Sequence, residues 1–461
     1  MSLPKELIIS LREALGEKWV VDDETAVERY LQDETPIGAK PVPSKEVVVA
    51  KPRTTSEVSS VVKLANKYRV PVYPRGGGTG LTGGSIPLQP GIILSLERMD
   101  KVNVDADNMV AEVEAGVTLG KLLEEADKHG LIFPAHPGDE GAFVGGLIAC
   151  NAGGARAVRT GVMRNYVLGI EVVTGTGDVL KLGGKTIKNN MGYNLAHLFI
   201  GSEGILGIIT KAYIRLYPKW KYTATVIMPF NTTISAIKTA QKILFSGMVP
   251  LAMEYFDRQV IELSAKNLGT TWQVSSGDYF LMLILAEPIE ESIFYQVEAM
   301  SKMAEAEGGL EPLIAQREDE QKHLLKIRSE IFTALKGKMY DSLDTTVPIG
   351  VIDKFIDKIN EVEKKYQVWI PTYGHVGDGN LHVHIMRYPG YSSEELENLK
   401  NEIYSITIEL GGNITGEHGI GYARRKYVEK MLGLTWVETM KSLKKALDPN
   451  NILNPGKVIP G

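Results

Sequence analysis

Glycine is concentrated in one segment of this chain, and that concentration limits how the segment can fold. The chain has 461 residues and 47 glycines, and 26 of these fall within the 133 residues from Arg75 to Gly207. The segment has no Gly-X-Y period, so it is not collagen-like, and it is too rich in Val, Ile and Leu for a disordered linker. A folded segment with this much glycine needs tight turns or a close approach of its backbone to another group.

The overall composition excludes several classes of protein. The 51 basic and 56 acidic residues give a net charge of −5, and no basic tract is present to bind nucleic acid. The apolar runs, such as 279–286, are far shorter than the ~20 residues of a membrane span, so we expect no transmembrane segment. The N-terminal residues show neither the apolar core of a signal peptide nor the Arg-rich character of a transit peptide, so we expect a cytoplasmic protein, which a partner could hold at a membrane. A single cysteine, Cys150, excludes an internal disulfide and any multi-cysteine metal site.

The spacing of apolar residues predicts an α+β chain in three parts, 1–217, 218–410 and 411–461. In the first part, short strands alternate with helices; we expect strands at 47–52, 70–73, 91–96, 109–113, 169–173 and 179–182, and helices at 56–68 and 119–129. The pattern of the sequence changes near Pro218, and beyond it we expect strands at 222–228, 252–256, 279–286, 369–373 and 381–385. The helices expected beyond that point are 234–245, 289–306, 317–336, 354–365, 393–410 and 425–447.

The first glycine cluster, residues 74–84, contains the pattern Gly-x-Gly-x-x-Gly at Gly78, Gly80 and Gly83. A Rossmann fingerprint must open a helix, and two prolines in the following residues 85–91 prevent one. A P-loop is also excluded, because Val179 stands where the first glycine ahead of 184–186 should be. The cluster therefore predicts a loop of successive backbone N–H groups, which can bind a phosphate. Two more clusters, at 137–154 and 201–207, suggest a long ligand such as a dinucleotide.

Four of the eight histidines lie within 44 residues: His375, His382, His384 and His418. His382 and His384 alternate with apolar residues, so a strand would point both imidazoles to one face. Glu417 adds a carboxylate next to His418, and glycines flank each of these segments. Two or three imidazoles with one carboxylate suit a divalent metal with an open coordination position.

Together, the three glycine clusters resemble the flavin-binding loops of the vanillyl-alcohol-oxidase/PCMH-type FAD flavoproteins. Within that superfamily the chain, from about residue 40 to the closing 454–457, resembles the D-2-hydroxyacid dehydrogenases, which include glycolate oxidase flavoprotein subunits, D-lactate dehydrogenases and D-2-hydroxyglutarate dehydrogenases. The resemblance implies a two-part PCMH-type FAD-binding domain and an α+β cap domain with an antiparallel sheet. It also implies a C-terminal helical segment that returns to the FAD domain.

The resemblance implies which residues bind FAD. Residues 75–80 would cradle the pyrophosphate, and Glu203, Gly204 and Ile208 would contact the adenine side. The first loop carries no His or Cys for a covalent link and Cys150 lies in an apolar run, so we expect non-covalent FAD. The full set expected around the cofactor is Pro74, Arg75, Gly76, Gly77, Gly78, Thr79, Gly80, Gly83, Pro137, Gly138, Asp139, Gly141, Gly145, Gly146, Asn151, Gly161, Glu203, Gly204, Ile208 and Asn454.

The resemblance also assigns the histidine cluster. Residues that match His375, His382 and Glu417 bind a divalent cation in these dehydrogenases, which here would be Zn, Fe or Mn, and the residue that matches His418 is the catalytic base. At the position of His384 the family often has Asn, so its role, as a fourth metal ligand or as a donor to the substrate, stays open.

Arg328 matches a family arginine that binds the substrate carboxylate. The family's second basic residue is not evident, because Ser342 occupies about that place, with Lys336 and Lys338 upstream. This difference favours a small monocarboxylate, D-lactate or glycolate, over the dicarboxylate D-2-hydroxyglutarate.

The expected reaction begins with a metal-chelated 2-hydroxy acid, whose hydroxyl proton passes to His418 while its Cα hydride passes to flavin N5. The chain has no cluster of its own, so the electrons would pass to an iron–sulfur subunit, an electron-transferring flavoprotein or a quinone. The sequence leaves open whether the chain forms a homodimer. Two alternatives are an FAD enzyme without net oxidation, as in the superfamily's ether-lipid synthase, and a scaffold subunit. The intact set of His375, His382, Glu417 and His418 argues against both.

Overall fold

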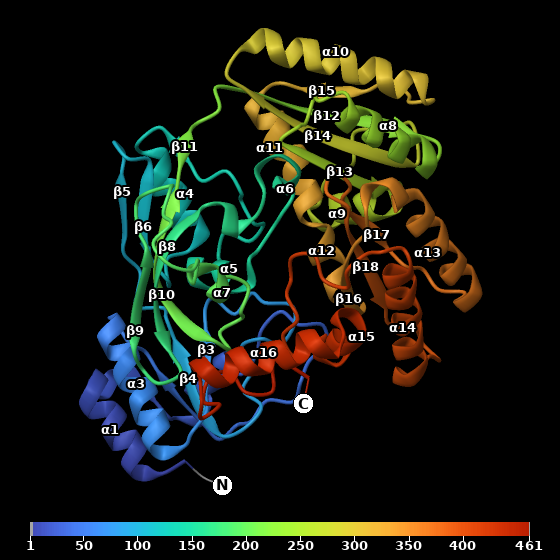
Figure 1. Cartoon of the computed structure of the whole chain (residues 1–461). Helices are drawn as coiled ribbons and strands as arrows, with labels where there is room; N and C mark the ends of the chain where they lie inside the picture. The colour runs from blue at the N-terminus through green and yellow to red at the C-terminus, as the bar shows by residue number, and fades with distance from the viewer. Residues whose placement is uncertain (1–2, 461) are drawn as a thin grey trace.

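The computed structural model describes residues 3–460 and contains three larger sheets and one two-stranded pair (Figure 1). The first sheet has the order β1-β2-β4-β3, and its last three strands are parallel. Helix α3 connects two of these parallel strands and begins with a hydrogen bond from the Glu57 N–H to the Thr54 hydroxyl. The elements are α1 (Lys5–Leu15), β1 (Val20–Val21), α2 (Glu24–Val27), β2 (Val47–Ala50), α3 (Thr55–Tyr68), β3 (Val72–Arg75) and β4 (Gly91–Ser95).

The second sheet is antiparallel, with the order β5-β6-β10-β8-β9, and together with the first sheet it forms the N-terminal part of the molecule, residues 3–218. Short helices pack on it, and the pair β7 and β11 closes one end. Its strands are β5 (Val102–Asp105), β6 (Val110–Glu114), β8 (Val167–Thr174), β9 (Val179–Gly183) and β10 (Gly207–Arg215), with β7 (Leu131–Ile132) and β11 (Tyr217–Pro218). The helices are α4 (Leu119–Asp127), α5 (Val144–Cys150), α6 (Ala157–Thr160) and α7 (Ala196–Phe199).

The third sheet has seven antiparallel strands in the order β15-β12-β14-β13-β17-β18-β16, and we call this sheet with its helices the cap. Its strands are β12 (Tyr222–Phe230), β13 (Ala252–Asp257), β14 (Tyr279–Glu287), β15 (Leu313–Ala315), β16 (Met339–Thr346), β17 (Thr372–His375) and β18 (Asn380–Met386). One face packs on α8 (Thr233–Phe245), α10 (Glu290–Ala306), α13 (Ile352–Tyr366) and α14 (Ser393–Glu409). The other face packs on α9 (Arg258–Asn267), α11 (Glu318–Ser329) and α12 (Ile331–Lys336).

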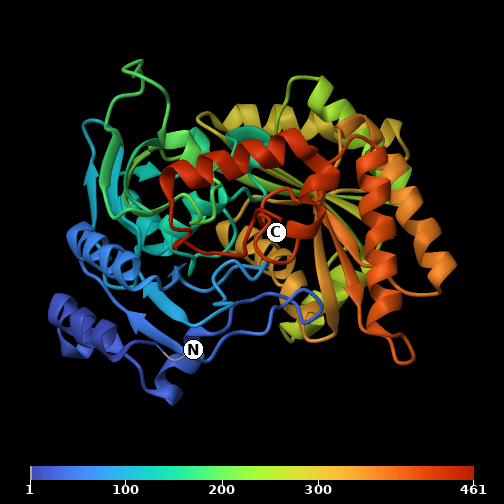
Figure 2. The ribbon, with the colours of Figure 1, turned by 60° about the horizontal axis from the view of Figure 1, so that its bottom comes forward.

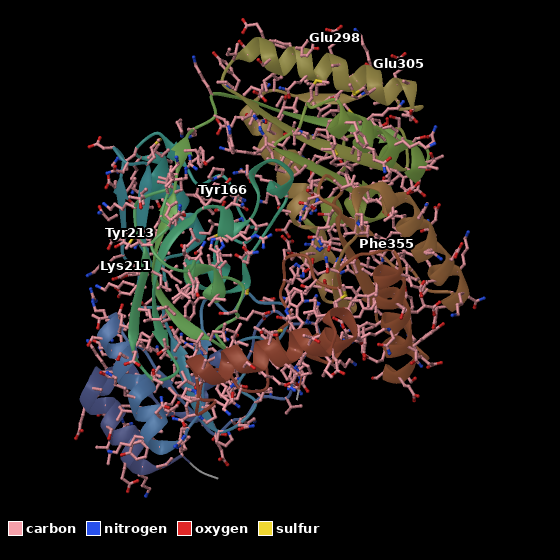
Figure 3. All side chains as sticks on the ribbon, viewed as in Figure 1. Tyr166, Lys211, Tyr213, Glu298, Glu305 and Phe355 are labelled. Atoms are coloured by element: carbon pink, nitrogen blue, oxygen red, sulfur yellow. The ribbon has the colours of Figure 1, made fainter. Side chains whose placement is uncertain are left out.

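Alternation along the cap strands decides which residues enter the core. Figure 3 shows Phe355 inside the cap, where it is fully buried, while Glu298 and Glu305 project outward from α10. On β18, Leu381, Val383 and Ile385 face the core under α13 and α14, so the intervening histidines must face the opposite side.

The C-terminal segment returns from the cap to the N-terminal part, as expected. Helix α15 (Val428–Leu432) leads into α16 (Leu434–Leu447), which Figures 1 and 2 show lying against both halves of the molecule. Beyond α16, Leu453 pairs with Val72 of β3, and the Asn454 side-chain amide donates hydrogen bonds to the carbonyls of Gly84 (3.0 Å) and Glu203 (3.1 Å). Within residues 3–460, no helix combines the length and apolar character that crossing a membrane requires.

Three expected elements differ in the structure. The helix expected at 317–336 is two helices that meet at Glu330, where the sequence has no glycine or proline to mark a break. The helix expected at 425–447 is interrupted at Gly433, whose left-handed φ of 84° ends α15. The strand expected at 369–373 runs instead from Thr372 to His375, so His375 lies on a strand and not in the glycine loop.

Candidate active site

A cavity of about 860 Å³ lies between the N-terminal part and the cap. One side is formed mainly by the loops 74–85, 136–156 and 203–209, and we call it the glycine wall. The opposite side is formed by cap residues from β13, β14, β16, β17, β18, α11 and α12, together with Glu417 and His418; we call it the side-chain wall. The glycine clusters and the histidine cluster therefore face a single cavity.

The glycine wall begins where β3 ends. Gly78 and Gly83 have left-handed φ angles of 78° and 69°, and a Cβ at Gly78 would overlap the guanidinium of Arg75. That buried guanidinium donates hydrogen bonds to the Ser85 hydroxyl (3.2 Å) and the Arg29 carbonyl (3.3 Å). Successive backbone N–H groups beside a buried cation suit a phosphate group.

Helix α5 shows two different uses of glycine at adjacent positions. A Cβ on Gly145 would stand 2.6 Å from the Ala115 Cβ, so this glycine allows the helix to pack closely on the chain behind it. A Cβ on Gly146 would have no heavy atom within 4 Å, so Gly146 faces open space in the cavity. Only the second position leaves room for a ligand to approach the helix.

Most of the residues expected around the cofactor line this cavity. They are Pro74, Arg75, Gly76, Gly77, Gly78, Thr79, Gly80, Pro137, Gly138, Asp139, Gly145, Gly146, Glu203, Gly204 and Ile208. Five others do not line it: Gly83, Gly141, Asn151, Gly161 and Asn454.

The side-chain wall follows from the register of three neighbouring cap strands. His382 of β18 pairs with Asp344 of β16 on one side and with Tyr373 of β17 on the other. His384 pairs with Ser342 of β16. Because paired residues of antiparallel strands point to the same face, these polar side chains gather on the face turned away from α13 and α14.

Three donor atoms of the expected metal set form a nearly equilateral triangle. His375 Nε2 and His382 Nε2 are 3.4 Å apart, and Glu417 Oε1 lies 3.5 Å from the first and 3.6 Å from the second. Tetrahedral ligands at bond lengths of about 2.0–2.2 Å lie about 3.3–3.6 Å from one another. The residues present therefore fit a divalent metal. His418 Nε2 lies beside this triangle, 3.7 Å from Glu417 Oε1.

Glu254 of β13 fixes the orientation of His375. This carboxylate is buried and accepts the Nδ1–H of His375 at 2.6 Å, which directs Nε2 into the triangle. Burial would raise the pKa of Glu254, but Arg328 and His375 outweigh that effect and lower it to about 2. Burial would lower the pKa of His375, but Glu254 and Glu417 raise it well above its ordinary value. A metal cation at Nε2 would take the place of the proton that these carboxylates otherwise stabilise.

Asp344 also lies among the imidazoles, within 4.8 Å of donor atoms of His382, Glu417 and His418. Its Oδ2, however, accepts hydrogen bonds from the backbone N–H groups of Gly416 (2.9 Å), Glu417 (2.9 Å) and His418 (2.8 Å). Burial would raise the pKa of Asp344, but the surrounding His418, Arg424 and His382 hold it below its usual range. The Asp344 oxygens accept these hydrogen bonds and lie on the Nδ1 side of the His382 and His418 rings. The triangle formed by His375 Nε2, His382 Nε2 and Glu417 Oε1 is therefore the better metal site.

Arg328 and His384 lie deeper on the side-chain wall. Arg328 forms an ion pair with Glu254, and its Nε is buried without a hydrogen-bond partner. His384 Nε2 lies 2.9 Å from the Tyr373 hydroxyl, and its Nδ1 likewise has no partner. The hydroxyl of Ser342, on the strand beside His384, is a third buried polar group without a partner. Polar atoms left unpaired on a cavity wall are suited to a ligand that supplies their partners.

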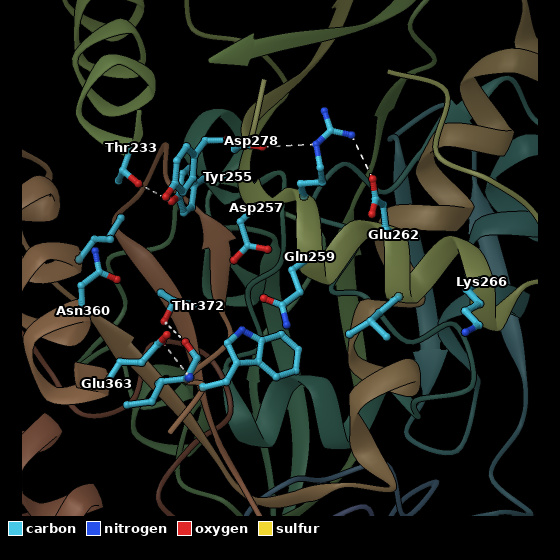
Figure 4. Close-up of a pocket in the computed structure, with 16 residues that line it drawn as sticks. Thr233, Tyr255, Asp257, Gln259, Glu262, Lys266, Asp278, Asn360, Glu363 and Thr372 are labelled. Carbon is cyan, nitrogen blue, oxygen red and sulfur yellow. Dashed lines mark hydrogen bonds and ion pairs between the residues drawn. The ribbon is translucent and has the colours of Figure 1, made fainter. Parts of the chain in front are cut away.

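A second cavity, of about 680 Å³, lies in the cap between α9 and α13 (Figure 4). Its polar groups are largely paired with one another: Thr233 with Tyr255, and Arg258 with Glu262. Glu363 accepts a hydrogen bond from the Ile370 N–H. Because no comparable set of unpaired groups converges there, the cavity between the two walls is the candidate active site.

The sequence alone did not reveal several residues of this site. Glu254 and Asp344 lie in apolar or hydroxyl-rich strands that each contain a second acid, Asp257 or Asp341, so the sequence did not single them out. His136 precedes the second glycine loop, has a left-handed φ of 43°, and lines the cavity. Cys150, expected to be a buried apolar residue, is only partly buried and also lines the cavity, while desolvation raises the pKa of its thiol to about 12.

Comparisons with known proteins agree with the fold. Residues 47–183 match the FAD binding domain model, and residues 219–458 match the model for the C-terminal domain of FAD linked oxidases. The chain is 41% identical to D-lactate dehydrogenase of Archaeoglobus fulgidus over 93% of this chain and 95% of that protein. It is 35% identical to glycolate oxidase subunit GlcD of Bacillus subtilis, over 90% and 88% of the two chains. The solved structure of p-cresol methylhydroxylase is 19% identical, with a TM-score of 0.78, and covers 98% of this chain and 96% of its own.

The two-part N-terminal region and the antiparallel cap thus form the fold of the PCMH-type flavoproteins. The chain belongs to the FAD-linked oxidase family, and it is an FAD-dependent oxidoreductase.

Proposed function

We propose that the chain oxidises a small D-2-hydroxy acid, D-lactate in the first place or glycolate, to the corresponding 2-oxo acid. The observation that carries this proposal is the convergence of His375, His382 and Glu417, with His418 beside them, on the wall opposite the glycine loops. The names of the relatives from A. fulgidus and B. subtilis support it. We also propose that the residues expected around the cofactor bind FAD, and that the chain divides into three parts, 1–217, 218–410 and 411–461.

Two bound groups complete the proposed site. When bound, non-covalent FAD would accept a hydride at N5, and a divalent cation, Zn, Fe or Mn, would lower the pKa of the substrate hydroxyl. His375, His382 and Glu417 would hold the cation, and the residues of the glycine wall would hold FAD.

The protein's own residues supply the proton transfer and the binding. His418 Nε2 lies next to Glu417 and takes the hydroxyl proton as general base. Arg328 binds the substrate carboxylate through the part of its guanidinium that Glu254 leaves free, including the unpaired Nε.

The composition of the side-chain wall supports a monocarboxylate substrate. Among the described residues that line this wall, Arg328 is the single Arg or Lys. The neutral Ser342 offers no second cation for the distal carboxylate of 2-hydroxyglutarate. The reduced flavin would pass its electrons to an iron–sulfur subunit, an electron-transferring flavoprotein or a quinone.

Anaerobic reduction of the purified protein tests the proposal. We expect the flavin absorbance to bleach on addition of D-lactate or glycolate, with L-lactate and D-2-hydroxyglutarate as controls that react much more slowly. Elemental analysis should find a divalent metal, and a chelator should slow the bleaching. A yellow protein that no 2-hydroxy acid bleaches would refute the proposed function.

A further inference from the structure

The loop that carries Glu417 and His418 is held at both ends by buried carboxylates from different parts of the molecule. From the cap, Asp344 Oδ2 accepts the N–H groups of three successive residues, 416–418, at 2.8–2.9 Å, and the Thr415 hydroxyl at 3.1 Å. From the N-terminal part, Glu203 accepts the N–H groups of Ile420 (2.7 Å) and Gly421 (2.8 Å). Five backbone N–H groups of this short loop therefore donate hydrogen bonds to two side chains, Asp344 and Glu203.

The sequence of the loop suits this arrangement. A Cβ at Gly416 would stand 2.6 Å from the Asn380 side chain, and Asn380 in turn donates a hydrogen bond to Asp344 Oδ1 at 2.9 Å. Gly419 has a left-handed φ of 83°, and a Cβ there would lie 2.9 Å from the Glu203 carboxylate. Glycine at these two positions leaves room for the Asn380 amide that supports Asp344 and for the Glu203 carboxylate.

Asp344 is completely buried, and a buried carboxylate is costly unless donors surround it. Its two oxygens have five donors: three N–H groups, one hydroxyl and the Asn380 amide. Its oxygens also lie 3.8 Å from Nδ1 of His382 and 3.8 Å from Nδ1 of His418, whose rings are stacked at 5.3 Å. The carboxylate thus contacts the backbone of one metal-ligating residue and of the base, and lies against the ring of a second ligand.

We propose that Asp344 is a positioning residue, which sets Glu417 against His375 and His382 and sets His418 beside them by binding the backbone of their loop. The inference rests on the proposed function for its kinetic readout, but the retention of metal tests it independently. Glu203 holds the far end of the same loop from the glycine wall, so the loop joins the two walls of the cavity.

The decisive variant is Asp344→Asn, with Asp341→Asn as the matched control. Asp341 is on the same strand and is also buried, but it pairs with Lys400 (3.1 Å). We expect Asp344→Asn to keep its flavin absorbance, to lose metal during dialysis against a chelator, and to lower kcat about 100-fold, because small misplacements of reacting groups have effects of this size. KM should change by no more than about threefold, since the effect is on the reacting geometry and not on ground-state binding. Asp341→Asn should lower the Tm and leave kcat and metal content near those of the wild type.

A milder variant keeps the test decisive if Asp344→Asn does not fold. Thr415→Val removes the hydroxyl that Asp344 Oδ2 (3.1 Å) and the Gly419 carbonyl of the same loop (3.0 Å) share, with little change in shape, and we expect it to lower kcat several-fold without loss of flavin. The positioning role would be overturned if Asp344→Asn kept the metal retention and kcat of the wild type. If only Thr415→Val folds, wild-type values in that variant would overturn it. An equal loss of metal and kcat in Asp341→Asn would also overturn it. If the wild type oxidises no 2-hydroxy acid, the proposed function fails, and the difference in metal retention between Asp344→Asn and Asp341→Asn still decides the positioning role.

Discussion

The two walls of the cavity use opposite kinds of residue. The glycine wall is built from backbone: at Gly78 and Gly83 the chain takes left-handed turns, and at Gly146 it leaves open space. The side-chain wall is built from buried imidazoles and carboxylates that hold one another in place, as Glu254 does with His375 and Arg328. A backbone wall can follow the outline of a large cofactor, whereas a side-chain wall can supply protons and metal ligands. The difference predicts that the two functions can be lost separately.

The largest expected effect is at the proposed base. His418→Ala removes the imidazole without touching the glycine wall, so the protein should remain yellow while kcat falls by about 10²–10⁴-fold, the usual contribution of a general base. Stopped-flow measurement of flavin bleaching by D-lactate checks this. Bleaching at the wild-type rate would exclude His418 as the base.

Glu254→Gln should have the next largest effect, and it should affect only the side-chain wall. The neutral amide loses the charge that pairs with Arg328 and with the Nδ1–H of His375. We expect metal affinity to fall by about 10–100-fold, as for other partners of metal-binding histidines, and KM for D-lactate to rise. Competition with a chromogenic chelator measures the first effect, and FAD content should not change. An unaltered metal affinity would contradict the orienting role of Glu254.

Gly146→Ala reverses the pattern and should affect only the glycine wall. The new methyl group projects into open cavity space, so the apoprotein should be as stable as the wild type or more so, by up to about 1 kcal/mol for alanine in a helix. FAD should nevertheless bind about tenfold more weakly, because a methyl group in a filled site forces the neighbouring groups apart.

Gly145→Ala is the matched control, since its methyl group would meet Ala115 at 2.6 Å and should lower the Tm of the apoprotein. Thermal melts and FAD titrations of both variants separate the two outcomes. Normal FAD affinity in Gly146→Ala would place the cofactor elsewhere in the cavity.

The smallest effect is expected for Ser342→Ala. The Ser342 hydroxyl is buried and has no hydrogen-bond partner among residues 3–460, so its removal should leave stability unchanged or slightly higher. If the substrate supplies its partner, KM for D-lactate should rise by a few-fold with little change in kcat. Steady-state kinetics and a thermal melt measure both. A lower Tm with an unchanged KM would show that the hydroxyl serves the fold and not the substrate.

More of the glycine wall than of the side-chain wall could be predicted from the sequence. Glycine-rich loops are local features, so their positions could be predicted without knowing what lies opposite them. Alternation likewise predicted a common face for His382 and His384. Glu254 and Asp344, in contrast, act on residues far away in the sequence, 121 residues for the pair Glu254–His375 and 74 for Asp344–His418. The neighbouring strands β13 and β17 bring Glu254 to His375, and an isolated bridge between Asp344 and Thr415 brings the loop of His418 to β16.

The errors in the predicted helices have a related cause. The apolar spacing of 425–447 continues through Gly433, and only the left-handed φ at that glycine shows where α15 ends. The break at Glu330 has no local signal at all, although it separates the helix that carries Arg328 from α12. Periodicity describes which face of a helix is buried, and it does not report where tertiary packing interrupts the helix.

The return of the C-terminal segment has a consequence for biosynthesis. Asn454 and Lys457 satisfy carbonyl groups of the first glycine loop, at Gly83, Gly84 and Ile86, across 370 to 374 residues of sequence. A ribosome that has completed the first 218 residues has made every glycine of the cofactor loops but not the residues that hold the first loop in shape. These hydrogen bonds to the first glycine loop can therefore form only after residues 454–457 have left the ribosome.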